Sequence, residues 1–194
     1  KANKIFSDLI VRSQKSKPED LGLYYLNLAI SYNNLSDKIN EEKYLIKSLQ
    51  IAKEQFGDKS AEAAYVNSEL GRYYLRASDY KKAKEYLLKA LTIQKKYSDN
   101  LIEEDLINTY SNLSELFLIG YSDFRKAEKY ILKAIDLNKK LFGIKNLDNI
   151  QLMDQYADIK MDKDNYSEAI KIYKKNLLDL QELDIKGFEY SNVL

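Results

Sequence analysis

A nine-residue segment recurs along this chain, and its recurrence constrains the fold more than any other feature. Two close copies, at 83–91 and 127–135, read AKEYLLKAL and AEKYILKAI, and looser copies occupy 41–49 and 169–177. Successive copies therefore begin 42, 44 and 42 residues apart. A fixed period of this size indicates an array of structural repeats, which offers an extended surface for partners rather than a pocket for chemistry.

The composition fits long helices joined by short turns. Of the 194 residues 45% are hydrophobic and 31% are charged, which is typical of a folded chain. One Pro and six Gly are too few for the many turns of an all-β protein. The balance of 31 Lys and Arg against 30 Asp and Glu, with no apolar run of membrane-spanning length, predicts neither a nucleic-acid nor a membrane partner.

The complete absence of cysteine and histidine excludes several chemistries. Thiol nucleophiles, imidazole bases, the usual zinc ligands and disulfides all require one of these residues. Asp154 and Asp158 could serve an enzyme, but they lie one helical turn apart with nothing nearby to separate their roles. We therefore predict no catalysis, no cofactor and no metal. We also predict a cytoplasmic location, with the periplasm as the alternative.

Each period is expected to form a helical hairpin. In the second, 61–77 forms one helix and 80–97 the return helix, with Val66, Leu70 and Tyr74 on one apolar stripe. Polar turns separate the helices, at Ser36-Asp37, Ser78-Asp79, Ser122-Asp123 and the run 162–165. Side chains of this kind suit the N-cap of the helix that follows.

Small and aromatic residues recur at fixed places in both helices. The first helices carry Leu28-Ala29 with Tyr32, Leu70-Gly71 with Tyr74, and Leu113-Ser114 with Phe117; the fourth copy has Tyr156-Ala157 with Lys160, which departs from the aromatic. The second helices pair Ala83 with Ala90 and Ala127 with Ala134, and Ser48 and Ala169 also fit, while Glu41 and Asn176 do not. Small side chains at these places let helices approach closely. The recurring tyrosines, Tyr32, Tyr44, Tyr74, Tyr86 and Tyr130, are expected to pack in the core.

This pattern resembles the tetratricopeptide repeat (TPR) family, in the long variety found in kinesin light chains and many bacterial repeat proteins. The family's usual period is about 34 residues, so each helix here would be longer by about one turn. The resemblance covers most of the chain, from about residue 20 to 183, and implies an all-α, right-handed superhelical solenoid of antiparallel helix hairpins. HEAT repeats have a similar period and are the structural alternative, but the small-residue pairs favour the TPR interpretation.

We predict that residues 1–194 form a single solenoid segment. It would contain a half-repeat at 1–17, repeats at about 18–59, 60–100, 101–145 and 146–185, and the start of a further repeat at 186–194. Neither end shows the polar face of a capping repeat, which suggests a window cut from a longer array and would permit self-association. Analogy with the family suggests a fragment of a larger multidomain bacterial signalling or regulatory protein.

The resemblance further implies that the first helices line a concave groove. The residues expected to face it are Asn27, Ile30, Asn34, Tyr65, Arg72, Arg76, Asn108, Asn112, Glu115, Asp154, Asp158 and Asp162. The like charges at Arg72 and Arg76, and along the three aspartates, each disfavour their helix by roughly 0.2–0.5 kcal/mol. They suggest a polarised groove for an extended peptide. The alternative is a solvated face on which Arg72 pairs with Glu115.

The asparagines suggest a second role for the groove. A side-chain amide both donates to and accepts from a peptide backbone, and long TPR arrays use asparagines in this way; an asparagine-rich genome is the alternative explanation. We therefore predict a non-catalytic scaffold that binds a peptide or protein partner in the concave groove. The alternative is a peptide-gated switch whose closure controls an attached output domain.

Overall fold

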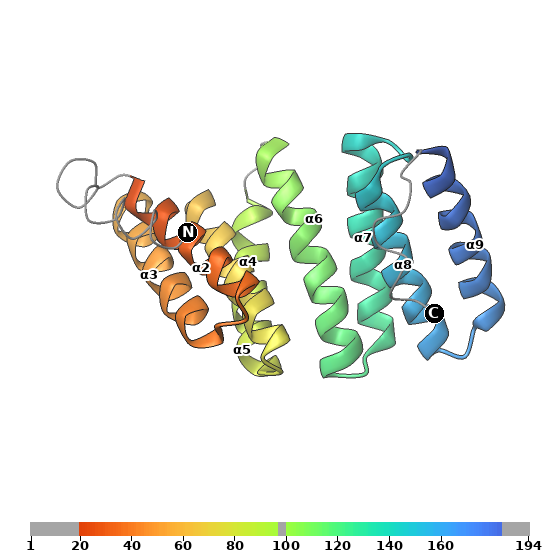
Figure 1. The fold of residues 1–194 in the computed structure, drawn as a ribbon, viewed down its shortest axis with the longest axis horizontal. Helices are drawn as coiled ribbons and strands as arrows, with labels where there is room; N and C mark the ends of the chain where they lie inside the picture. The colour runs from red at the N-terminus through yellow and green to blue at the C-terminus, as the bar shows by residue number, and fades with distance from the viewer. Residues whose placement is uncertain (1–19, 97–99, 184–194) are drawn as a thin grey trace. The chain divides into compact units, whose positions relative to one another are not determined.

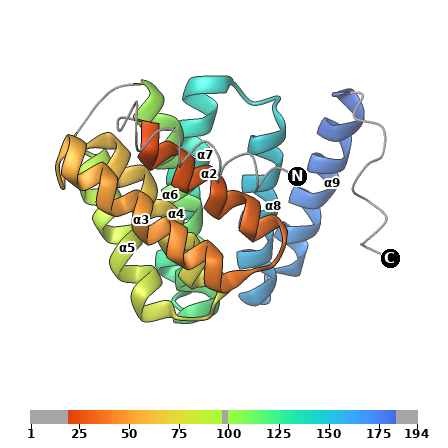
Figure 2. The same ribbon diagram turned by 60° about the vertical axis from the view of Figure 1, so that its left-hand side comes forward.

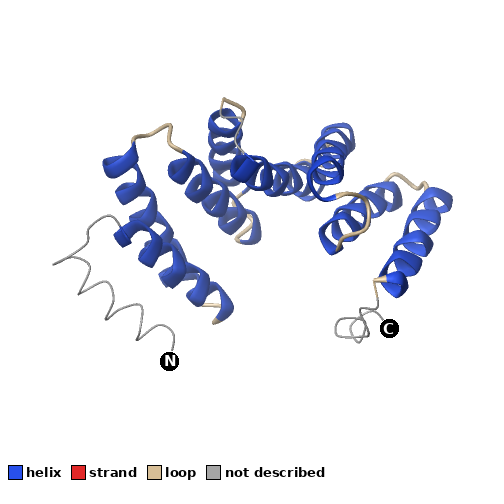
Figure 3. Cartoon of the chain, turned by 90° about the horizontal axis from the view of Figure 1, so that it is seen from above, coloured by secondary structure: helices blue, strands red, loops and turns tan. Residues whose placement is uncertain are grey.

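The computed structural model describes residues 20–96 and 100–183 of the chain. Every regular element in these two ranges is helical (Figure 3). The chain divides into two compact units, residues 1–105 and 106–194, which are considered separately. The predicted half-repeat at 1–17 and the predicted start of another repeat at 186–194 lie outside the described residues.

The first unit contains two antiparallel helix hairpins. Helices α2 (Leu21–Asn34) and α3 (Lys38–Phe56) form the first, and α4 (Ala61–Arg76) and α5 (Tyr80–Gln94) form the second. Helix α3 also packs against α4, which joins the two hairpins (Figures 1 and 2). Helix α5 ends three residues before Tyr97, the predicted end, which itself lies outside the described residues.

The second unit begins within α6 (Asn100–Glu115), which continues into the π-helical turn η2 (Leu116–Gly120). Helix α7 (Phe124–Phe142) returns along η2 and also packs against α8 (Leu147–Asp162), which pairs with α9 (Tyr166–Glu182). The predicted all-α fold of repeated helix hairpins is therefore confirmed. The division into repeats, and their continuity as one superhelix, stay predictions.

The serine–aspartate turns have one geometry in all three hairpins that contain them. Ser36, Ser78 and Ser122 adopt left-handed backbone angles, with φ of 58°, 59° and 49°. The following aspartate caps the second helix each time: in the second hairpin Asp79 accepts from the backbone nitrogen of Lys82 at 3.1 Å. The predicted N-caps at these turns are thus confirmed. In the fourth hairpin Asp164 takes the left-handed conformation, and the N-cap, Asn165, makes no side-chain capping bond.

An aromatic pair stacks inside each of the first three hairpins. Tyr32 lies on Tyr44 with ring centroids 5.5 Å apart, Tyr74 on Tyr86 at 5.4 Å, and Phe117 on Tyr130 at 5.6 Å. The two rings of each pair are within 10° of parallel. These positions are equivalent in the repeat, so the tyrosines serve packing within the hairpin, as the sequence predicted.

Close helix contact explains the small residues. Leu28, Leu70 and Leu113 are fully buried, with 0% exposure, as are the paired alanines Ala83 and Ala90. Beside Leu70, Gly71 faces α5 so closely that a Cβ placed on it would lie 2.5 Å from Cγ of Leu87. At this crossing the second hairpin leaves no room for even a methyl group.

Two departures from the small-residue pattern form polar contacts in the core. Asn176 is 4% exposed and donates to the carbonyl of Ile150 at 3.2 Å. Ser48 makes the equivalent bond in the first hairpin, to the carbonyl of Gly22 at 2.9 Å. Glu41, 5% exposed, is paired with the Arg76 guanidinium of the next hairpin. These departures are therefore accommodated by internal hydrogen bonds and pairing.

One of the two extra residues in the 44-residue spacing between the second and third copies has a visible local cause. The step from the aromatic position to the N-cap is five residues in the second hairpin, where the nitrogen of Asp79 bonds to the carbonyl of Tyr74. In the third hairpin it is six, and the nitrogen of Asp123 bonds to the carbonyl of Phe117 at 2.8 Å. The π-helical turn η2 holds this extra residue, as single-residue insertions in helices commonly do.

Candidate functional site: an apolar cavity in the first unit

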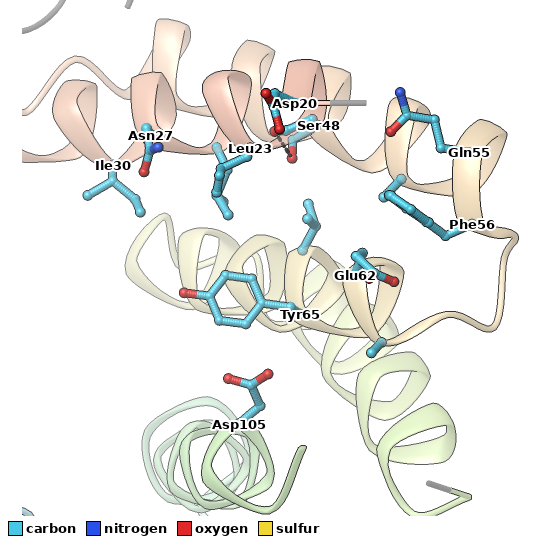
Figure 4. A pocket seen from close by; sticks show the side chains of 15 residues that line it. Asp20, Leu23, Asn27, Ile30, Ser48, Gln55, Phe56, Glu62, Tyr65 and Asp105 are labelled. Carbon is cyan, nitrogen blue, oxygen red and sulfur yellow. Dashed lines mark hydrogen bonds between the residues drawn. The ribbon is translucent and has the colours of Figure 1, made fainter. Parts of the chain in front are cut away.

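The first unit contains an open cavity of about 530 Å³ bounded by α2, α3, α4 and the first part of α6 (Figure 4). Its walls are mainly apolar, with Leu23, Leu26, Ile30, Phe56 and Val66 among the lining residues. Leu23 is 56% exposed and Phe56 is 52% exposed, so a large part of this apolar surface faces solvent. The volume falls within the roughly 300–1,000 Å³ of typical ligand sites.

Three carboxylates from successive first helices line the same cavity. Asp20 is the N-cap of α2, Glu62 lies in the first turn of α4, and Asp105 lies on α6. Each stands eight residues before the buried leucine of its own helix, so the three occupy one repeat position. We call these three residues the acidic row. None of the residues that line this cavity in the described part of the chain is Lys or Arg.

Asp105 is the most perturbed member of the acidic row. Burial, together with the neighbouring charges of Glu104 and Glu69, raises the pKa of its carboxyl to about 6. The ring of Tyr65 lies next to this carboxylate in the cavity (Figure 4). Burial and the nearby charges of Glu69 and Asp105 also raise the pKa of the Tyr65 hydroxyl. Burial and the acidic neighbours thus disfavour the ionised form of Asp105.

Three of the predicted groove residues lie on this cavity: Asn27, Ile30 and Tyr65. In Figure 4 the side chains of Asn27 and Ile30 point from α2 into the space that faces Tyr65 on α4. Asn34, near the end of α2, is exposed and does not line the cavity.

The predicted cationic patch is engaged by neighbouring carboxylates. Arg72 pairs with Glu69, one turn earlier in α4, at 2.5 Å. Arg76 pairs with Glu41 of α3, whose pKa is raised by burial against the opposing influence of that arginine. Arg76 thus links the two hairpins, and replacing it would disturb their packing as well as any partner contact.

The predicted groove residues of the second unit lie on α6 and α8. Asn108 and Glu115 are exposed, and Asn112 is half-buried.

Two aspartates of the predicted acidic stripe are engaged within their own hairpin. Asp154 accepts from Asn176 at 2.8 Å, Asp158 accepts from Tyr173 at 2.5 Å, and Asp162 is exposed at the end of α8. Burial raises the pKa of Asp154, an effect that the Asn176 bond opposes.

Sequence reasoning missed Leu23, Phe56 and the acidic row. The row had a signal in the sequence. An acidic residue stands eight residues before Leu28, Leu70, Leu113 and Tyr156, namely Asp20, Glu62, Asp105 and Asp148 respectively. Phe56 had no such signal, since it ends a second helix and reaches the cavity only through the packing of α3.

The fold and the cavity define a tandem helical-repeat protein with an open, partly apolar cavity in its first unit. Residues 20–96 match the family described as tetratricopeptide repeat. A comparison with curated proteins finds no match to the sequence. None of the helices in the two described ranges has the length and hydropathy required to cross a bilayer.

Solved structures extend the likeness in fold to nearly the whole chain. The crystal structure of BtubC (BKLC) from P. vanneervenii matches with a TM-score of 0.80 at 16% identity, over 96% of this chain and 75% of that one. A Podosopora anserina kinesin light chain with nearly identical TPR-like repeats matches at 0.70 and 11% identity, over 94% and 86%. The apo form of RapI matches at 0.76 and 15% identity, over 92% and 63%.

Proposed function

We propose that this protein is a non-catalytic interaction scaffold that holds a peptide segment of a partner in the cavity of its first unit. The observation that carries the proposal is the exposed apolar surface of that cavity, which Leu23 and Phe56 dominate. Burying such surface against a partner side chain is favourable, because it removes apolar area from water. The cytoplasmic location and the bacterial regulatory setting predicted from the sequence belong to the same proposal.

The polar groups of the cavity suit an extended backbone. The side-chain amide of Asn27 points into the cavity (Figure 4) and makes no hydrogen bond within the described part of the chain. An amide can donate to a peptide carbonyl and accept from a peptide N–H, which holds a chain without dictating its sequence. Tyr65 adds a ring with a polar tip, a side-chain type that is enriched at interfaces.

Filling the cavity tests this function directly. Peptides selected from a displayed random library on the wild-type protein would be labelled, and their affinities measured by fluorescence anisotropy. Ile30→Trp places a large ring in the cavity and is expected to weaken binding at least tenfold. The matched control is Ile39→Trp, at an α3 position that is 81% exposed and does not line the cavity. Equal affinity for the wild type and the Ile30 variant would refute the proposal.

A peptide-gated switch is the second candidate. It is favoured by Asp105, because this residue lines the cavity and also ends the first compact unit on a helix that continues into the second. A bound peptide could thereby influence residues beyond the cavity. Small-angle scattering with and without a selected peptide separates the two functions, since a passive scaffold keeps its radius of gyration.

A further inference from the structure

We infer that the cavity of the first unit takes a cationic peptide segment, in which a bulky apolar side chain lies beside a Lys or Arg. This inference rests on the proposed function and specifies the class of its partner. It joins two properties of one site, the apolar walls and the charge of the acidic row.

The charge of the lining selects the sign of the partner. Among the lining residues that belong to ranges 20–96 and 100–183, the acidic row contributes the formal charges, and none is Lys or Arg. The nearby cation Arg72 is paired with Glu69 at 2.5 Å. A basic segment would therefore be attracted to the site, whereas an acidic segment would place like charges together in a partly desolvated space.

The apolar walls of the cavity require the partner to carry an apolar side chain as well as a positive charge. Leu23 and Phe56 are each more than half exposed, and with Ile30 they form an apolar wall that water covers poorly. A lysine alone would leave this wall in contact with solvent. An apolar side chain of the peptide would cover it and so anchor the segment beside the acidic row.

Asp105 gives the cation a defined place. The carboxylate lies beside the ring of Tyr65 (Figure 4), so one ammonium or guanidinium group could pair with the first and contact the second. Burial and the charges of Glu104 and Glu69 raise the pKa of Asp105. A bound cation would favour the ionised carboxylate.

The test uses three matched peptide pools and the full chain. Each labelled peptide carries a central Phe and Leu, and its alternate positions hold only Lys, only Gln or only Glu. We expect the Lys pool to bind at least tenfold more tightly than the Gln pool, and the Glu pool to bind most weakly. Asp105→Asn should reduce the preference for Lys over Gln by about three- to tenfold. The control Asp148→Asn, at the equivalent position of α8 and outside the cavity, should leave it unchanged.

The possible outcomes separate this inference from the proposed function. Equal binding of all three pools, abolished by Ile30→Trp, would overturn the cationic class and leave the scaffold in place. A Lys preference of undiminished size in Ile30→Trp or in Asp105→Asn would mean charge attraction elsewhere on the surface, and would overturn the inference. Failure of every pool and every selected peptide to bind would refute both. Salt screens charge pairs. If 0.5 M salt removes the preference for Lys over Gln while the peptides still bind, the acidic row provides the charge selectivity and the apolar wall provides the remaining affinity, which would support the inference.

Discussion

The ammonium group of Lys160 lies 2.6 Å from Oε1 of Glu128, and only 9% of the lysine side chain is exposed. Tyr74 makes the corresponding contact in the first unit, where its hydroxyl donates to Glu42 at 2.5 Å. In both cases a first helix bonds to the second helix of the preceding hairpin. The lysine that departs from the aromatic pattern thus retains a polar contact between hairpins that the tyrosine also makes.

Glu128→Gln should destabilise the protein by roughly 1–3 kcal/mol at neutral pH, because the buried ammonium of Lys160 would lose its nearest carboxylate, and the other carboxylate that it pairs with, Glu168, lies farther away at 3.3 Å. Hydrogen bonds from Lys160 and Lys163 lower the pKa of Glu128 to about 2. This stabilisation is present above the ordinary pKa of 4.5 and is lost as the pH falls toward 2. Urea unfolding at several pH values measures it. Glu85→Gln, which removes an exposed pair with Lys89, should cost much less stability than Glu128→Gln.

Gly71→Ala should destabilise the first unit by roughly 1–3 kcal/mol, although alanine favours helix more than glycine does. The new Cβ would lie 2.5 Å from Cγ and 2.6 Å from Cδ2 of Leu87, which forces the helices apart. Thermal unfolding followed by circular dichroism reports the change. In a Leu87→Ala background the same substitution should cost much less, and an equal cost in both backgrounds would contradict the steric explanation.

Ser78→Gly should leave stability unchanged or raise it by up to about 1 kcal/mol. A left-handed conformation costs a non-glycine residue on the order of 1 kcal/mol, which glycine avoids at the expense of some chain entropy. The φ of Ser78 is 59°. The contrasting substitution is Ser60→Gly, where φ is −79° and the side chain caps α4 by accepting from Ala63. That change should lower stability by a few tenths of a kcal/mol in the same chemical unfolding experiment.

Asp105→Asn should stabilise the protein above about pH 6, by on the order of 1 kcal/mol after allowance for solvent screening. The folded pKa of about 6 exceeds the ordinary 3.8, so folding becomes less favourable as the pH rises between these values. The groups that act on this carboxyl or line its cavity are Glu69, Glu104, Tyr65 and the rest of the acidic row. Melting temperatures of the variant and wild type should converge below pH 4. A constant difference at every pH would show that ionisation is not the cause.

Much of the local architecture was predictable from residue spacing. The recurrence of Leu28, Leu70 and Leu113 at one register predicts a buried stripe, and all three are fully buried. The Ser-Asp dipeptides likewise predicted the caps, because a capping bond joins residues only three apart in the chain. Such features depend on contacts between residues that are close in the chain, so residue spacing is enough to predict them.

The site depended on contacts between distant residues. Arg76 looks like part of a free cationic patch in sequence, yet its partner is the buried Glu41 of α3. Asp154, which the sequence predicts to face a groove, accepts a hydrogen bond from Asn176 of the paired helix. Whether a polar side chain is offered to a partner or used internally depends on which second helix it faces, and spacing does not encode that.

The sequence by itself determined that this chain is a TPR-like array of helix hairpins, because the repeat, the small residues and the turns are each local and periodic. Only the tertiary structure decided where a partner can bind. The cavity exists because α3 brings Phe56 to the space between α2 and α4, while α6 adds Asp105 beside Tyr65. Side-chain packing of α2, α3, α4 and the first part of α6 makes an apolar wall and an acidic row into one site, and no single repeat contains it.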